Sequence, residues 1–358
     1  MNVTTADTSR TIQGHLDGHA PGFRKGHEGG SRTPTSGAPV VPGAANDGGS
    51  APRLERPTAD IDRLLLRTSR TFALAIPELP EPLRREVGVA YLLFRIADTF
   101  EDATRWPRSE RLGALAAFDR LLGASPWPQD EAWRLAALWV DARPCDHEGY
   151  LELLGAVPGV LGELEAITPV RRAAIVHHTL RTSEGMAGFV ASGTEDGNLR
   201  LGTLADLQHY CYIVAGIVGE LLTDLFVDFA PQLESARAFL AARARAFGEG
   251  LQLVNILKDA DSDACHGRVY LPPGLARSEI LALARTNLDA AAEYVSALQV
   301  GGAPRGLVGF TALPVLLARA TLDRLERFGA GRSISRVEVG AIFARLQADL
   351  DAGASVID

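Results

Sequence analysis

Carboxylates in one segment of the chain have a spacing that suits a metal site. Asp98 and Asp102 lie four residues apart, with Glu101 beside them. They follow residues 91–97, a mainly apolar run that should be buried. Residues four apart share one face of a helix, where like charges repel each other. Because carboxylates beside a buried run need compensation, which a divalent cation provides, the pattern predicts a first metal-binding helix face.

A second segment repeats this pattern with Asn255, Asp259 and Asp263, which recur every four residues. On a helix they would form a polar stripe among apolar side chains such as Leu253 and Leu257. Mg²⁺ prefers oxygen ligands and commonly bridges carboxylates to substrate phosphates. Two such faces on different helices would hold a diphosphate between them. The alternative, a solvated helix face in each place, is left open by the spacing alone.

The rest of the chain indicates the helices that position these side chains. Hydrophobic residues make up 46% of the chain and aromatic residues only 6%, which favours helices over sheets. No stretch shows the sustained alternation of a strand, and a break is expected at Pro158. About ten helices with short loops predict a single all-α domain around a central space. The expected helices are 58–76, 81–103, 108–123, 130–141, 148–156, 170–191, 203–229, 233–262, 276–298, 304–328 and 334–351.

Residues 1–55 differ in composition from the remainder. They are rich in Gly, Pro, Ser, Thr and Asn and contain few large apolar residues. Such a segment cannot bury enough surface to offset its chain entropy. We therefore expect a disordered tail over 1–55 and a single helical domain over 56–358.

Charge and hydropathy narrow the possible partners and the location. The formal net charge of −8 argues against nucleic-acid binding, and three scattered cysteines suit a reducing cytoplasm. No signal peptide is evident. Residues 210–230 are the best candidate for a membrane span, but Glu220, Asp224 and Asp228 lie within them. We expect a cytoplasmic monomer whose membrane contact, if it has any, is peripheral.

Five stretches, in this order along the chain, resemble the motifs of the squalene/phytoene synthase family. The resemblance extends over residues 58–350, approximately. It implies an all-α isoprenoid synthase helical bundle around a large central cavity. It also implies head-to-head condensation of two allylic diphosphates through a cyclopropyl intermediate. The stretches are 69–72 (SRTF), 91–102 (YLLFRIADTFED), 184–187 (EGMA), 210–219 (YCYIVAGIVG) and 251–272 (LQLVNILKDADSDACHGRVYLP).

The resemblance also implies roles for particular residues. Tyr210 would lie near the step that loses a proton, although a buried core tyrosine is an alternative. Arg95 and Lys258 could instead simply balance the aspartates. The implied metal ligands are Asp98, Glu101, Asp102, Asn255, Asp259 and Asp263, with Glu101 and Asn255 the weaker candidates. The implied diphosphate-binding residues are Ser69, Arg70, Arg95, Lys258 and Arg268.

Two products compete within the family. A squalene synthase reduces the cyclopropyl intermediate with NADPH, whereas a phytoene or dehydrosqualene synthase loses a proton instead. Residues 98–102, 210–219 and 312–322 resemble the squalene branch. Residues 255–259 with 268–272 resemble the bacterial phytoene branch. We expect farnesyl diphosphate as the substrate, Mg²⁺ (or Mn²⁺) as the metal, and NADPH as the reductant.

Other functions are weighed against this expectation. A phytoene synthase would act on geranylgeranyl diphosphate without a reductant. A terpene cyclase that uses one diphosphate would share the paired acidic motifs, but it should lack the motif at 210–219. A non-catalytic helical assembly factor would have no need of four intact aspartates.

Overall fold

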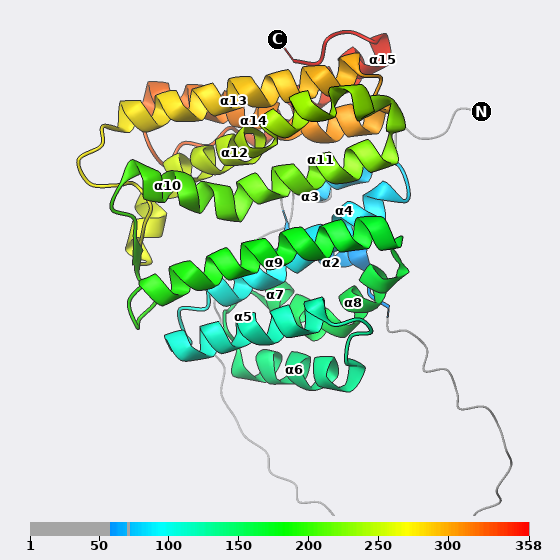
Figure 1. The fold of residues 1–358 in the computed structure, drawn as a ribbon. Helices are drawn as coiled ribbons and strands as arrows, with labels where there is room; N and C mark the ends of the chain where they lie inside the picture. Colours follow the sequence, from blue (N-terminus) through cyan, green and yellow to red (C-terminus); the bar gives the residue numbers. More distant parts are fainter. Residues whose placement is uncertain (1–57, 70–71, 358) are drawn as a thin grey trace, which may run out of the picture. The chain divides into compact units, whose positions relative to one another are not determined.

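The computed structural model describes residues 58–69 and 72–357 (Figure 1). Within these residues the regular secondary structure is helical apart from one short pair of strands. They belong to one compact unit. The all-α class expected from the sequence is therefore confirmed. The predicted tail, residues 1–55, and Arg70 lie outside the described residues.

Helices joined by short turns make up the first half of the described chain. The first of them is capped by Asp60, whose carboxylate accepts a hydrogen bond from the backbone of Arg63 at 3.0 Å. The elements are α2 (Ile61–Thr68), α3 (Phe72–Ala75), η1 (Ile76–Glu78), α4 (Leu83–Glu101), α5 (Arg108–Gly123), α6 (Gln129–Ala142), α7 (Glu148–Gly155), α8 (Val157–Ala166) and α9 (Pro169–Ser192).

The second half contains the two strands and the longest helix. The strands pair in parallel, with Leu199 opposite Arg268, and this pairing holds the segment that follows the longest helix. The elements are β1 (Leu199–Arg200), α10 (Leu204–Cys211), η2 (Tyr212–Gly216), α11 (Ile217–Phe229), η3 (Pro231–Ala236), α12 (Arg237–Cys265), β2 (Arg268–Val269), α13 (Arg277–Val300), α14 (Arg305–Phe328) and α15 (Arg336–Ala352).

The structure differs from the expected helices in three places, one of which is the π-helical turn η2 within the helix expected over 203–229. The helix expected over 58–76 ends early, because Ser69 has an extended backbone (φ −132°, ψ 149°). Pro158 does not break the chain but lies in the first turn of α8, a helix that the sequence analysis missed. Proline is tolerated in a first turn because the backbone amide it lacks would have no partner there.

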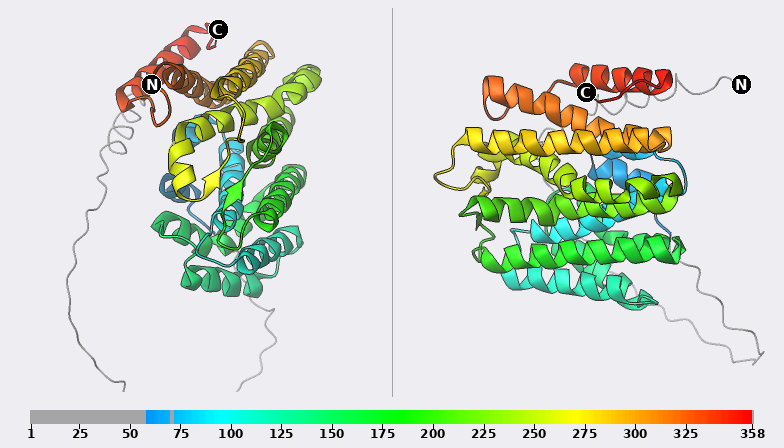
Figure 2. Two further views of the ribbon diagram at one scale, coloured as in Figure 1. Left: turned by 90° about the vertical axis from the view of Figure 1, so that its left-hand side faces the viewer. Right: turned by 45° about the horizontal axis from the view of Figure 1, so that its top comes forward.

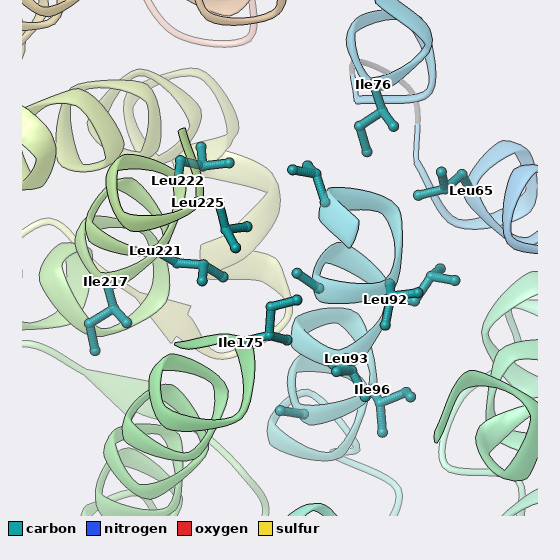
Figure 3. Close-up of a cluster of buried hydrophobic side chains, with 14 of the residues drawn as sticks. Leu65, Ile76, Leu92, Leu93, Ile96, Ile175, Ile217, Leu221, Leu222 and Leu225 are labelled. Carbon is teal, nitrogen blue, oxygen red and sulfur yellow. The ribbon is translucent and has the colours of Figure 1, made fainter. Parts of the chain in front are cut away.

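Apolar side chains from α4, α9 and α11 meet in the core that carries the site. Figure 3 shows Leu92 and Ile96 of α4, Ile175 of α9 and Leu221 of α11, all at most 1% exposed. Truncating one of these leucines to alanine would cost about 2–5 kcal/mol, because the cavity left behind adds to the lost burial. This core therefore fixes the positions of the helices that carry the first acidic segment and the tyrosine motif.

Two glycines allow η2 and α11 to approach α12 closely. A Cβ atom on Gly219 would lie 1.9 Å from the carbonyl oxygen of Ala244. A Cβ on Gly248 would lie 1.9 Å from the carbonyl oxygen of Ala215. Neither backbone atom can move aside cheaply, so larger residues would force the helices apart. The long helices run roughly side by side, as the right-hand view of Figure 2 shows.

Among residues 58–69 and 72–357, two helical stretches are long and apolar enough to cross a membrane by length and composition. They are Leu204–Phe229 and Arg305–Phe328. In each, 67% of the most apolar 18-residue segment is buried inside the structure. Core helices pass the same test, so the finding is weak evidence for a span. The cytoplasmic location and the peripheral membrane contact stay predictions.

Candidate active site

A cavity of about 500 Å³ lies among α4, η2, α11 and α12. Along α4 its wall runs from Val87 to Asp102, and along α12 it runs from Phe247 to Asp263. At 1.5 Å per residue, each helix follows the cavity for roughly 20 Å. On both helices the apolar residues come first and the acidic residues come last. The cavity therefore has an apolar body and one polar end, which suits a molecule with an anionic head and a long apolar tail.

The two acidic segments meet at this polar end. The side chains there are carboxylates and one amide, from the C-terminal halves of α4 and α12. Burial and the charge of Asp102, at the end of α4, both raise the pKa of Asp263 on α12. The lining carboxylates and the amide that adjoins them are Asp98, Asp102, Asn255, Asp259 and Asp263. The structure thus brings together residues that are more than 150 positions apart in the sequence.

These carboxylates lie in surroundings that disfavour their charge. Burial raises the pKa of Asp98, and burial together with the neighbouring Glu101 raises the pKa of Asp102 to about 7. The Asp102 side chain is 56% exposed, because it faces the open cavity. Burial, Asp259 and Asp102 likewise raise the pKa of Asp263. A cation among them would remove this repulsion.

Glu101 and Arg268 form a buried ion pair beside the cavity. Arg268 donates to the Glu101 carboxylate at 2.7 Å and to the Glu101 carbonyl oxygen at 3.0 Å. It also donates to Asp102 at 2.9 Å, and Arg111 donates to the same Glu101 carbonyl oxygen. The side chains of Glu101 and Arg268 are 1% and 7% exposed.

This pairing bears on two predicted roles. Oxygen atoms of Asp98, Glu101 and Asp102 lie within 4.8 Å of one another, so the three could share a metal ion. However, the cavity-lining residues in the described part of the chain do not include Glu101 or Arg268. We give more weight to the ion pair, because it already satisfies the Glu101 carboxylate. Arg268 thus joins β2 to the end of α4.

The other predicted cations and Ser69 are placed as follows. Arg95 lines the cavity, forms an ion pair with Asp98, and donates to the Tyr91 hydroxyl at 3.1 Å. Lys258 lies 3.2 Å from the Asp259 carboxylate, on the flank of the acidic face. The Ser69 hydroxyl accepts a hydrogen bond from the backbone of Phe72 at 3.1 Å, so in this structure it caps α3. Their roles toward a diphosphate stay predictions.

Two tyrosines meet on the cavity wall. Tyr210 is 5% exposed and its hydroxyl donates to the Tyr270 hydroxyl at 3.1 Å, with ring centroids 4.7 Å apart. Burial raises the pKa of both well above the usual value, so both hydroxyls keep their protons at neutral pH. Sequence reasoning singled out Tyr210 and missed Tyr270. Its place two residues after Arg268, within the second acidic motif, was the available signal.

Comparison with known proteins identifies the family. A family model described as squalene/phytoene synthase matches residues 65–279, which is more than half of the chain. The chain belongs to the squalene/phytoene synthase family, as the motifs indicated.

Individual relatives agree with this assignment. The chain is 27% identical to the squalene synthase of Schizosaccharomyces pombe over 290 residues, which cover 74% of this chain and 59% of that protein. It is 32% identical to squalene synthase ERG9 of Candida albicans over 212 residues, or 58% of this chain and 44% of that protein. The chain thus spans about half the length of the curated relatives it matches.

Solved structures agree with the fold. The complex of TcSQS with the ligand E5700 matches with a TM-score of 0.65 and 26% identity, over 82% of this chain and 87% of that one. A dehydrosqualene synthase in complex with a ligand matches with a TM-score of 0.52 and 18% identity, over 82% and 95%. The second match shows the fold alone. The predicted isoprenoid synthase bundle is confirmed.

Proposed function

We propose that the protein condenses two molecules of farnesyl diphosphate head to head, through presqualene diphosphate, and reduces that intermediate to squalene with NADPH. One observation carries the proposal. The acidic ends of α4 and α12 meet at one end of a cavity whose remaining wall is mainly apolar. An isoprenoid diphosphate has the matching shape, with an anionic head and an apolar chain.

The donor set at the polar end fits Mg²⁺. Four carboxylates and one amide face the cavity there, and all offer the hard oxygen ligands that Mg²⁺ prefers. Asp98 and Asp102 would hold the metal from α4, and Asp259 and Asp263 would hold it from α12. When bound, Mg²⁺ neutralises the charge that develops on a leaving diphosphate.

The described residues support the two stages as follows. In the first stage the allylic C–O bond of one substrate breaks and the double bond of the second substrate attacks the resulting cation. Loss of a proton then closes the cyclopropane. Tyr210, which keeps its own proton, lies where it could relay that proton to the released diphosphate or face the cation with its ring.

The second stage breaks the C–O bond of presqualene diphosphate and ends with transfer of hydride from NADPH. The apolar wall keeps water away from the cation, which water would otherwise capture. Phe72, Met186 and Phe310 contribute to this wall. Arg95 faces the cavity beside Asp98, which supports a contact from its guanidinium to a diphosphate oxygen.

Product analysis tests the proposal. The purified protein is incubated with Mg²⁺ and either farnesyl or geranylgeranyl diphosphate, with and without NADPH, and the products are identified by gas chromatography and mass spectrometry. We expect squalene from farnesyl diphosphate when NADPH is present. Conversion of geranylgeranyl diphosphate to phytoene, with farnesyl diphosphate untouched and no effect of NADPH, would overturn the proposal in favour of the phytoene branch. The Asp98→Asn variant is the control, and it should form neither product.

A further inference from the structure

A single π-helical turn interrupts the segment that carries Tyr210. This turn is η2, and it begins two residues after the tyrosine. The backbone N–H of Ile217 bonds to the carbonyl oxygen of Tyr212, five residues earlier, rather than to that of Ile213. Such a turn contains one residue more than an α-helix would use, and it rotates everything before it relative to everything after it.

The rotation changes which cavity-lining side chains share a face with Tyr210. Tyr210, Val214, Val218, Leu221 and Leu222 all line the cavity. In a regular α-helix the step from Tyr210 to Leu222 would turn by about 1200°, which is about 120° beyond three full turns. One inserted residue absorbs about 100° of that excess and leaves about 20°. The π-helical turn therefore aligns Tyr210 with Val218 and Leu222, whereas a regular helix would align it with Leu221.

The bypassed carbonyl group of Ile213 has a partner on another helix. It accepts a hydrogen bond from the hydroxyl of Thr182 at 3.1 Å, and Thr182 on α9 is fully buried. One turn further along α9, Gly185 leaves room for the Ile213 side chain, since a Cβ there would lie 2.4 Å from Ile213 Cγ2. On the opposite side, Gly248 of α12 makes the same kind of room for the Ala215 carbonyl group.

This bond differs from the usual behaviour of a threonine within a helix. Thr68, Thr99, Thr223 and Thr321 each donate to the carbonyl oxygen four residues earlier in their own helix. Thr182 instead donates across to η2. Its hydroxyl meets the carbonyl oxygen that the irregular turn bypasses.

We propose that Thr182 is a positioning residue, whose hydroxyl holds the π-helical turn that directs Tyr210 into the cavity. The inference rests on the proposed function in so far as Tyr210 acts in the reaction. If the hydroxyl is lost, a buried carbonyl loses its partner, and the turn should open more readily by about tenfold. Chemistry should then suffer more than substrate binding, because the acidic faces that bind the diphosphate are untouched.

Kinetics of two variants test this role. Thr182→Val should lower kcat by about tenfold with KM within about twofold of the wild type. Thr182→Ser keeps the hydroxyl and should restore most of the turnover. In a Tyr210→Phe background the same Thr182→Val change should cost much less, because its effect acts through the tyrosine. An unchanged kcat in Thr182→Val, or an equal loss in both backgrounds, would overturn the proposal.

Hydrogen exchange gives a test that needs no activity. Amides of a peptide covering residues 212–217 should exchange about tenfold faster in Thr182→Val and at the wild-type rate in Thr182→Ser. Thr311→Val is the matched control, because Thr311 is equally buried but bonds only within α14. Thr311→Val should leave the amide exchange rate of this peptide unchanged. An unchanged exchange rate in Thr182→Val would refute the proposal that Thr182 stabilises the π-helical turn. A wild-type protein that forms no coupled product would refute only the proposed function.

Discussion

Loss of the buried Glu101–Arg268 pair should strongly destabilise the protein. Arg268→Met would leave the Glu101 carboxylate, 1% exposed, without the guanidinium that now donates to it at 2.7 Å. Breaking a buried pair by removing one partner costs about 3–5 kcal/mol, since the remaining charge cannot reach water. Glu101→Gln keeps the size and a carbonyl oxygen, so it should cost less, about 1–3 kcal/mol.

Thermal and urea unfolding of the purified variants would measure this loss. For a unit of this size, about 3–5 kcal/mol corresponds to a decrease in Tm of roughly 5–10 °C. The double variant should lose less than the sum of the two single variants, because its second change removes a charge that already lacks a partner.

Asp323→Asn serves as the control. It removes an exposed pair with Arg285, whose side chains are 54% and 38% exposed, and should cost at most about 1 kcal/mol. If Arg268→Met cost no more than this control, the reasoning that Arg268 joins β2 to α4 through a buried charge would be wrong.

Three further outcomes are expected. Excess EDTA should abolish turnover, and Mg²⁺ or Mn²⁺ should restore it; full activity in EDTA would contradict this. Asp259→Asn should lower turnover by orders of magnitude and leave the helicity measured by circular dichroism unchanged. A chain that begins at Pro57 should stay folded and active, because residues 1–55 are poor in large apolar residues; loss of solubility or activity would show that the tail has a role. Burial raises the pKa of Tyr294, so the folded protein keeps a proton that the unfolded chain releases near pH 10; stability should therefore fall as the pH rises above about 10, and Tyr294→Phe should flatten this fall in Tm between pH 9 and 11.

The sequence predicted those features of the site that are local. The spacing of Asp98 with Asp102, and of Asn255 with Asp259 and Asp263, placed each set on one helix face. Each set does line the cavity. The period of an α-helix is the same in almost any tertiary context. Polar residues spaced four apart in the sequence therefore reliably indicate a shared helix face. The ordered motifs then predicted the family and the fold.

The sequence could not show features that depend on distant contacts. Arg268 and Glu101 are 167 positions apart, so their pairing, which turns Glu101 away from the cavity wall, has no local signature. The two-residue strands that hold Arg268 are too short to alternate visibly. The π-helical turn depends on Thr182 and Gly248, which belong to other helices. A regular helix over 203–229 was the natural expectation.

The amount of diphosphate released per molecule of coupled product tests the central claim most directly. Purified protein would be given farnesyl diphosphate and Mg²⁺, and the released diphosphate and the products would be counted together. Without NADPH, the account predicts presqualene diphosphate and one diphosphate for each molecule of it. With NADPH, it predicts squalene and two diphosphates for each molecule. Diphosphate release from single substrate molecules, with no coupled product in either condition, would contradict the account.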